Sequence, residues 1–257
     1  MPLIDTHCHL DVAAFDADRD RVLHNARQAG VGGFVIPGID AAGWPGLLDL
    51  CHRQADCHPA LGLHPVFLDR HQPSDLETLR QQVIHARPLA IGEIGLDYLA
   101  DKQNHDRQQR LLEQQLELAS ECRLPVLLHV RKAHDPMLRC LRNHPLPGGI
   151  AHAFNGNLQQ AHHYLDLGFK LGFGGMLTFQ RSRKLRELAR KLPQHALVLE
   201  TDAPDMTVAA HRGERNSPEY LPDCLDALAE VRGEDREKVA EYTAGNAQEV
   251  LNFRHRG

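Results

Sequence analysis

Short apolar runs alternate with longer amphipathic stretches along the whole chain. The apolar runs predict strands at residues 3–7, 33–37, 60–64, 89–94, 125–129, 149–152, 169–174 and 196–201. Between them, apolar residues recur at helical spacing, most clearly at Leu112, Leu116 and Ala119. These stretches predict helices at residues 16–29, 44–53, 74–86, 106–122, 135–142, 157–167, 182–192, 217–232 and 235–251.

Start and stop signals support several of these helices. Ser74 and Glu77 are spaced as a capping box, in which each side chain binds a backbone N–H of the other's turn. Ser217 and Pro218 are typical of an N-cap and a first helical residue, and Gly30 is typical of a helix end. The helix boundaries are therefore predicted from capping as well as from periodicity.

Eight strand–helix units without an intervening linker predict a (β/α)8 TIM barrel, and we expect residues 1–257 to form one such domain. A doubly wound open sheet is the alternative. The count of eight units favours the barrel, as does the position of polar residues at the predicted strand ends. No G-x-G-x-x-G segment follows the first strand, so a dinucleotide site has no support.

Composition narrows the class of protein. Hydrophobic residues make up 42% of the 257 positions and charged residues 25%, which excludes a disordered or fibrous chain. No apolar run approaches the roughly 20 residues that span a bilayer, and the N-terminus does not resemble a secretory signal, so we expect a cytoplasmic protein.

Six cysteines without a C-x-x-C pair predict reduced thiols. The net charge of −5 argues against coating of long nucleic acid by bulk charge.

His7 and His9 stand at the end of the first predicted strand. Residues two apart in a strand point to the same face, so both imidazoles are expected to face the barrel mouth, with Cys8 turned toward the helices. Neutral imidazole is a common metal ligand. Taken alone, an H-x-H pair at a strand end is a moderate indication of a metal site.

Other predicted strands also end in polar residues. Glu93, His129, His152 and Asp202 each follow a strongly apolar run. Any one of them alone is better explained as a hydrogen-bonded rim residue. Together with His7 and His9 they make six polar groups in one small space, where many polar atoms would be unpaired unless they bind cations. We therefore predict two divalent cations, with Glu93 as the carboxylate that bridges them.

Four segments carry a resemblance to a known family. They are residues 3–11 (LIDTHCHLD), 92–98 (GEIGLDY), 125–135 (PVLLHVRKAHD) and 197–204 (LVLETDAP). In this order and at these separations they resemble the motifs of the TatD family of metal-dependent deoxyribonucleases and hydrolases, which has the amidohydrolase-like barrel. The His134–Asp135 pair and the Asp205–Met206 pair are similar to its YjjV-like branch.

The resemblance implies a binuclear centre. One cation would be bound by His7, His9, Glu93 and Asp202, and the other by Glu93, His129 and His152. Related amidohydrolases often use a carbamylated lysine as bridge, which is not expected here because Glu93 stands at that position. Residues 152–156 read HAFNG, where relatives often have Gly and Ser at the second and fourth places, but His152 itself is present, so the expected ligand set is unchanged.

The resemblance also implies hydrolysis of phosphodiester bonds in DNA or another nucleotide-containing substrate, by a monomer. Two cations about 3.5–4 Å apart can activate water and stabilise a phosphoryl oxygen. Asp202 is expected to be the general base, although a role as ligand alone is nearly as well supported. The donor types suit Zn²⁺, Mn²⁺ or Fe²⁺ better than Mg²⁺.

Three further residues belong to the predicted site. His64 is expected to contact substrate or to cap a loop, Arg131 to bind a phosphate or form a rim salt bridge, and Glu200 to support a ligand or become one. A basic run from Arg181 to Lys191 could line a nucleic-acid track, although most such runs are solvated helix faces. A small-molecule ester, amide or phosphate hydrolase and a non-catalytic binding protein are the alternative functions.

Overall fold

The computed structural model describes residues 2–99 and 104–253, in which eight parallel strands form one sheet. The strands are β1 (Leu3–Asp5), β2 (Val31–Pro37), β3 (Cys57–Leu61), β4 (Ala90–Asp97), β5 (Val126–Arg131), β6 (Gly149–Ala151), β7 (Phe169–Phe173) and β8 (Leu197–Leu199). Each strand pairs with the next in chain order, so all carboxyl ends of the strands lie at the same end of the sheet.

The segments that follow β1 and β8 bring the two outer strands together. Thr6 N–H donates to the Leu199 carbonyl at 3.0 Å, and Asp202 N–H donates to the His7 carbonyl at 2.8 Å. The sheet is thus a nearly closed barrel, and the predicted (β/α)8 fold is confirmed. The seam lies beside the histidines that the first motif supplies.

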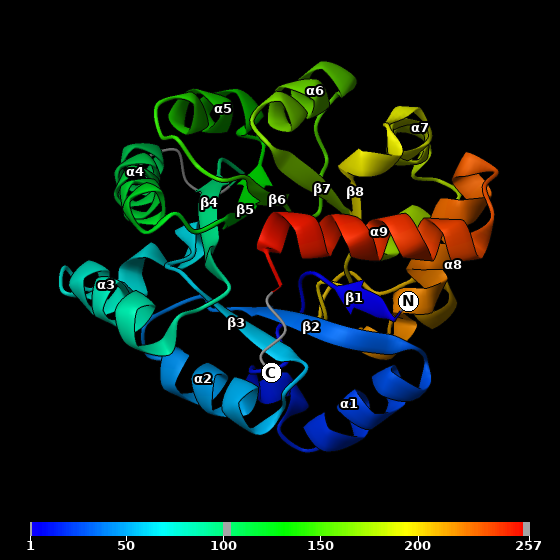
Figure 1. Cartoon of the computed structure of the whole chain (residues 1–257), viewed down its shortest axis with the longest axis horizontal. Coiled ribbons are helices and arrows are strands. Elements are labelled where there is room, and N and C mark those ends of the chain that lie inside the picture. Colours follow the sequence, from blue (N-terminus) through cyan, green and yellow to red (C-terminus); the bar gives the residue numbers. More distant parts are fainter. Residues whose placement is uncertain (1, 100–103, 254–257) are drawn as a thin grey trace.

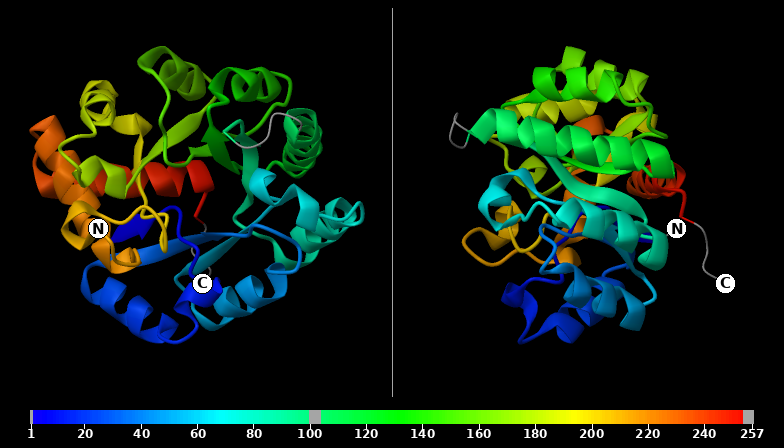
Figure 2. Two further views of the ribbon diagram at one scale, coloured as in Figure 1. Left: turned by 180° about the vertical axis from the view of Figure 1, so that it is seen from behind. Right: turned by 90° about the vertical axis from the view of Figure 1, so that its left-hand side faces the viewer.

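Helices surround the barrel between the strands (Figures 1 and 2). They are α1 (Arg19–Gln28), α2 (Trp44–Arg53), α3 (Asp75–Ala86), α4 (His105–Cys122), α5 (His134–Arg142), α6 (Leu158–Asp166), α7 (Arg183–Lys191), α8 (Leu221–Arg232) and α9 (Arg236–Leu251). Large apolar side chains such as Phe34, Leu128 and Tyr164 are buried in the layer between the strands and these helices.

The last helix, α9, crosses one end of the barrel, as Figure 1 shows. Its residues Ala247 and Val250 belong to a second buried cluster with the inward-facing strand residues Val35, Leu127 and Val198. Small and branched side chains therefore fill the barrel interior below α9. Helix α9 thus covers the end of the barrel opposite the carboxyl ends of the strands.

Several element boundaries differ from the sequence-based prediction. Strand β1 ends at Asp5, so His7 and His9 lie beyond the strand, and β3 ends at Leu61, before His64. Strand β4 instead continues to Asp97. Strand ends follow the backbone pairing with neighbours, which an apolar run does not encode.

The predicted capping box at Ser74 was wrong. The Ser74 side chain makes no cap hydrogen bond, and the Asp75 carboxylate instead accepts the Gln72 N–H at 2.9 Å. A complete capping box is present at α6, where Asn157 and Gln160 bind each other's backbone N–H at 2.9 and 3.0 Å. Both segments have suitable residues, but only Asn157 has the extended backbone that an N-cap needs.

No helix within residues 2–99 and 104–253 is long and apolar enough to cross a bilayer. All six cysteines lie in the described part of the chain, and none of them forms a disulfide there.

Candidate metal centre

The carboxyl ends of the strands surround a cavity of about 1700 Å³. Its wall includes eight of the nine residues predicted to act in the site: His9, His64, Glu93, His129, Arg131, His152, Glu200 and Asp202. His7 lies just beneath this wall and is fully buried. The fold therefore gathers at one end of the barrel residues that are up to 195 positions apart (from 7 to 202) in the sequence.

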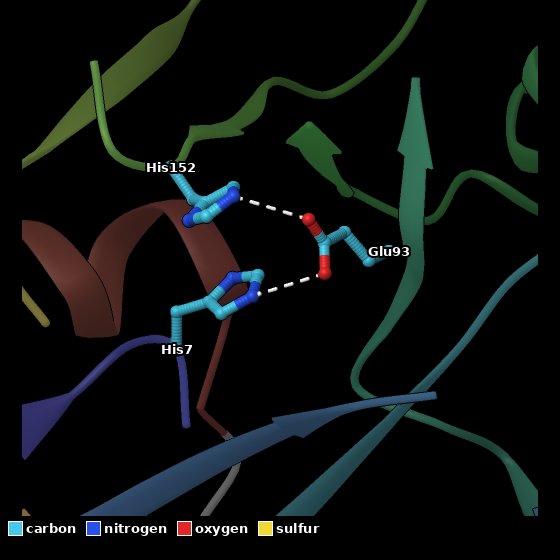
Figure 3. A group of neighbouring side chains, drawn as sticks. All are labelled: His7, Glu93 and His152. Atoms are coloured by element: carbon cyan, nitrogen blue, oxygen red, sulfur yellow. Dashed lines mark hydrogen bonds and ion pairs between the residues drawn. The ribbon is translucent and has the colours of Figure 1, made fainter. Parts of the chain in front are cut away.

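Glu93 lies at the centre of this group. Its Oε2 is 3.2 Å from His7 Nε2 and 3.5 Å from His9 Nε2, whereas its Oε1 is 3.0 Å from both His129 Nδ1 and His152 Nε2. Figure 3 shows the carboxylate between His7 and His152, with one oxygen toward each ring. The two oxygens thus face different sets of histidines, as a bridging carboxylate requires.

Asp202 lies on the β1 side of the centre. Its Oδ1 is 3.7 Å from Nε2 of both His7 and His9. The residue has a left-handed backbone (φ 58°), which is uncommon for a non-glycine residue. This conformation lets the Asp202 N–H bind the His7 carbonyl at 2.8 Å while its carboxylate faces the same histidine's ring.

Neighbouring acceptors set the orientation of two histidines. His9 Nδ1 lies 3.2 Å from the Pro37 carbonyl, and His129 Nε2 lies 3.0 Å from Asp97 Oδ2. Each acceptor takes the N–H of its imidazole, so the other nitrogen keeps a lone pair directed at the centre. The role of Asp97 was missed in the sequence, although a carboxylate four residues after Glu93 on the same strand was an available signal.

His64 both caps a turn and faces the centre. Its Nδ1 accepts the Val66 N–H at 3.2 Å, at the start of a 3₁₀ turn, and its Nε2 is 3.2 Å from Glu93 Oε1. Since Nδ1 is the acceptor, a neutral His64 carries its proton on Nε2 and donates it to Glu93. Burial lowers the pKa of His64, which favours this neutral form despite the nearby Glu93 charge. His64 is therefore a hydrogen-bond donor toward the site.

Glu200 lies behind His152, on the side away from Glu93. Its Oε1 accepts the Ala153 N–H at 2.5 Å and is 3.7 Å from His152 Nδ1. Gly172 in β7 provides the space, because a Cβ at this position would overlap the Glu200 carboxylate. Glu200 thus supports the segment that carries His152.

Arg131 lies at the rim of the cavity, at the end of β5. Its side chain is 57% exposed, and Nη1 is 4.0 Å from Asp97 Oδ2, the outer limit of an ion pair. Near this rim, Tyr98 stacks on His105 at the start of α4, with ring centroids 3.7 Å apart.

Asp5 belongs to the first motif, but the motif alone predicted no role for it. Its carboxylate accepts hydrogen bonds from the Thr201 hydroxyl at 2.6 Å, the Thr201 N–H at 3.0 Å and the His7 N–H at 3.2 Å. Full burial raises the pKa of Asp5 to about 7, although these hydrogen bonds oppose the shift. Asp5 joins the two segments that carry His7 and Asp202.

The charges around Glu93 show what kind of group fits here. Burial would raise the pKa of Glu93, but His64, His7 and His152 outweigh burial and hold that pKa well below its usual range. Burial and the charge of His152 lower the pKa of His7 to about 3. Burial also lowers the pKa of His152, but Glu93 and Glu200 outweigh burial and raise this pKa well above the usual value. The buried carboxylate thus requires positive charge beside it.

Within the part of the chain that the structure describes, three sets of donor atoms could hold a metal ion. They are His7, Glu93 and His152; His7, His9 and Asp202; and His64, Glu93 and His129, with the donor atoms of each set within 4.8 Å of one another. Imidazole nitrogens mixed with carboxylate oxygens suit Zn²⁺, Mn²⁺ and Fe²⁺. The donor chemistry and the need for positive charge therefore both fit a metal centre.

Residues 4–252 match the family described as TatD related DNase. The chain belongs to the TatD family. This membership makes it one of a group of metal-dependent hydrolases, in agreement with the donor set at the barrel mouth.

The similarity to individual members of the family covers nearly the whole chain. The chain is 42% identical to the uncharacterized metal-dependent hydrolase YjjV of Escherichia coli K12 over 97% of both chains. The crystal structure of that YjjV covers 98% of both chains with a TM-score of 0.94. The chain is also 33% identical to the 3′-5′ ssDNA/RNA exonuclease TatD of Salmonella typhimurium, over 97% of this chain and 98% of that protein.

The segment after β6, in which this chain departs from the expected family motif, has a hydrogen-bonding role. Asn155 Nδ2 donates to the carbonyls of Val130 and Ala153 at 3.3 and 3.1 Å, so its Oδ1 is the atom that accepts from His134 Nε2 at 3.1 Å. His134 Nδ1 then accepts from the Tyr164 hydroxyl at 3.2 Å. The asparagine therefore anchors the His152 loop to α5 and α6.

Proposed function

We propose that this protein hydrolyses phosphodiester bonds in nucleic acid with two divalent cations bridged by Glu93. The proposal assigns one cation to His7, His9, Glu93 and Asp202, and the other to Glu93, His129 and His152. The observation that carries it is the division of the Glu93 oxygens, with Oε2 toward His7 and His9 and Oε1 toward His129 and His152. When bound, such a pair of cations activates water and stabilises charge on a phosphoryl group.

Asp202 is the proposed general base. Burial raises its pKa to about 6, against the charges of His152 and His9. A carboxylate beside the water that the cations would activate can accept the proton of that water. Its side chain is 16% exposed, so it remains accessible from the cavity.

His64 is proposed to contact the substrate or to hold the Glu93 carboxylate in position by a hydrogen bond during the reaction. Its Nε2–H points to Glu93 Oε1, and its ring lies against that of His129 with centroids 4.5 Å apart. A donor fixed in this direction can stabilise negative charge that develops beside the carboxylate.

Nucleic acid is the proposed substrate class on two grounds. A relative 33% identical over nearly the full chain carries the name 3′-5′ ssDNA/RNA exonuclease. Arg131, Arg181 and Arg183 also line the cavity, and their positive charges suit the binding of phosphates.

The test is an assay of purified protein supplied with Mn²⁺, using an end-labelled single-stranded oligonucleotide and a panel of carboxyl esters, amides and phosphomonoesters. We expect release of mononucleotides, reduced at least about 100-fold in Asp202→Asn and His129→Ala. Asp166→Asn, at a 77% exposed position on α6, is the control and should retain wild-type activity. Hydrolysis of the small substrates with none of the oligonucleotide would reject the nuclease and favour the small-molecule alternative.

A further inference from the structure

One part of the cavity wall carries cations that have no acidic partner. Arg181, Arg183 and Lys184 line the cavity at the start of α7, and Lys132 lines it after β5. All four are exposed, and none forms an ion pair with another residue in the described ranges 2–99 and 104–253. The chain as a whole has a net charge of −5, so this local excess of positive charge is not a general property of its surface.

Other basic residues of the same run have structural roles. Arg186 donates to the Leu177 carbonyl at 2.9 Å and to Glu230 at 2.8 Å, which fixes α7 to the preceding turn and to α8. Lys191 pairs with Glu187 at 2.8 Å. The basic run thus contains three kinds of residue. Arg186 holds α7 in place, Lys191 lines the cavity but is paired with Glu187, and Arg181, Arg183 and Lys184 line the cavity without such a partner.

Arg181, Arg183, Lys184 and Lys132 together form what we call the cationic wall. Its α7 part packs on the loop that carries Asp202. The turn before α7 packs closely on the loop after β8, because a Cβ at Gly175 would overlap the backbone of Met206. Thr178 Oγ1 accepts the Ala209 N–H from that loop at 2.8 Å. Figure 1 shows α7 beside β7 and β8. These interactions fix the cations relative to the centre.

The opposite wall has a different character. Toward β1 to β3 the cavity is lined by Val12, Ile39 and Phe67, besides the site histidines, and none of these three carries a charge. Among the described residues of the cavity wall, a polyanion that reaches the centre therefore meets the unpaired cations on the β5 to β7 side. The asymmetry gives a bound strand one favoured direction away from the centre.

We infer that Arg181, Arg183, Lys184 and Lys132 bind the phosphates that flank the scissile one, and that the enzyme selects oligonucleotides over small phosphodiesters through them. The inference rests on the proposed phosphodiesterase function and specifies its substrate. Exposed cations without carboxylate partners exchange solvent counterions for phosphates, so binding through them weakens with salt. A small diester has no flanking phosphate and gains nothing from this wall.

The test compares wild type with the triple variant Arg181→Gln, Arg183→Gln, Lys184→Gln. With Mn²⁺ present, kcat/KM is measured for a single-stranded decanucleotide and for bis(p-nitrophenyl) phosphate. We expect the ratio of the two values to fall at least about tenfold in the variant. Arg190→Gln is the matched control: it lies on the same helix with a 60% exposed side chain, outside the cavity wall, and should keep the wild-type ratio.

Equilibrium binding gives a readout independent of turnover. The dissociation constant of a fluorescent, hydrolysis-resistant phosphorothioate oligonucleotide is measured by anisotropy at several KCl concentrations. The slope of log Kd against log[KCl] should decrease by about 0.7 for each phosphate that the protein no longer neutralises, or about 2 in the triple variant. Lys132→Asn, which suits the left-handed backbone at that position (φ 57°), tests a different loop should the triple variant fold poorly.

The outcomes separate the two proposals. If wild type hydrolyses neither substrate, the phosphodiesterase function fails. If wild type hydrolyses both, but the variants keep the wild-type ratio and salt slope, the function stands and the cationic wall is rejected. An equal fall on both substrates also contradicts the inference, because it would locate the effect at the centre itself.

Discussion

The imidazole rings of His7 and His152 are stacked, with centroids 3.9 Å apart and planes within 15° of parallel. They come from the ends of β1 and β6, and Glu93 offers one carboxylate oxygen to each (Figure 3). Two charged rings in this arrangement would repel each other, and the low pKa of His7, near 3, reflects burial together with this repulsion. Glu93 therefore contacts both rings, and in the proposed centre it would bridge the two cations.

Substitution of this carboxylate should affect both cations. We expect Glu93→Gln to lower the bound metal from about two ions per chain to near none, because an amide bridges cations poorly. His9→Ala and His129→Ala should each leave about one ion, since each removes a ligand of one side only. Elemental analysis after desalting measures this, and equal loss of both ions in His9→Ala and His129→Ala would contradict the proposed division of ligands.

Asp97 should tune the metal affinity of the His129 side. Its Oδ2 is 3.0 Å from His129 Nε2, so the carboxylate orients the ring and increases its basicity. Asp97→Asn is expected to weaken metal binding about 10- to 100-fold, as measured by competition with a chromogenic chelator. Asp69→Asn, at an 88% exposed position, is the control. An affinity for Asp97→Asn within twofold of wild type would reject this role.

Gly172 should be required for the position of Glu200. An alanine Cβ would overlap the Glu200 carboxylate, so Gly172→Ala should lower the free energy of unfolding by about 1–3 kcal/mol. Gly46→Ala in α2, where no atom lies within 4 Å of the new Cβ, should be neutral or stabilise by up to about 1 kcal/mol.

A double-mutant cycle in urea unfolding checks the cause of the Gly172 effect. If the overlap with Glu200 is responsible, Gly172→Ala should cost much less in a Glu200→Ala background. The same cost in both backgrounds would show that the destabilisation arises elsewhere in β7.

His134 should make stability depend on pH. Burial lowers its pKa in the folded protein, although the hydrogen bond with Asn155 opposes the shift. As pH falls, the unfolded chain therefore binds a proton at His134 first, near pH 6.5, and the folded state loses relative stability below that pH. Wild type should lose more unfolding free energy between about pH 7 and pH 5 than His134→Gln, in urea titrations at each pH. Identical pH profiles for the two proteins would contradict the assignment.

The local pattern of the sequence determined the order of the barrel and the choice of metal-centre candidates. Eight alternating units predicted the parallel strands, and polar residues after apolar runs, such as His7, Glu93 and Asp202, identified the end of the barrel to examine. These features are encoded within a few neighbouring residues, because strand and helix periodicity and the i, i+2 spacing are properties of one segment.

Only the tertiary structure decided which atom faces which. Asp97 could be matched with His129, and Asp5 with Thr201, only when segments 32 and 196 residues apart were placed side by side. The division of the basic run, with Arg186 bound to Glu230 and Arg183 facing the cavity, likewise depends on how α7 packs on α8. Hydrogen bonds and ion pairs form over distances of about 3 Å, and the relative placement of distant segments at that precision arises from packing of the whole barrel.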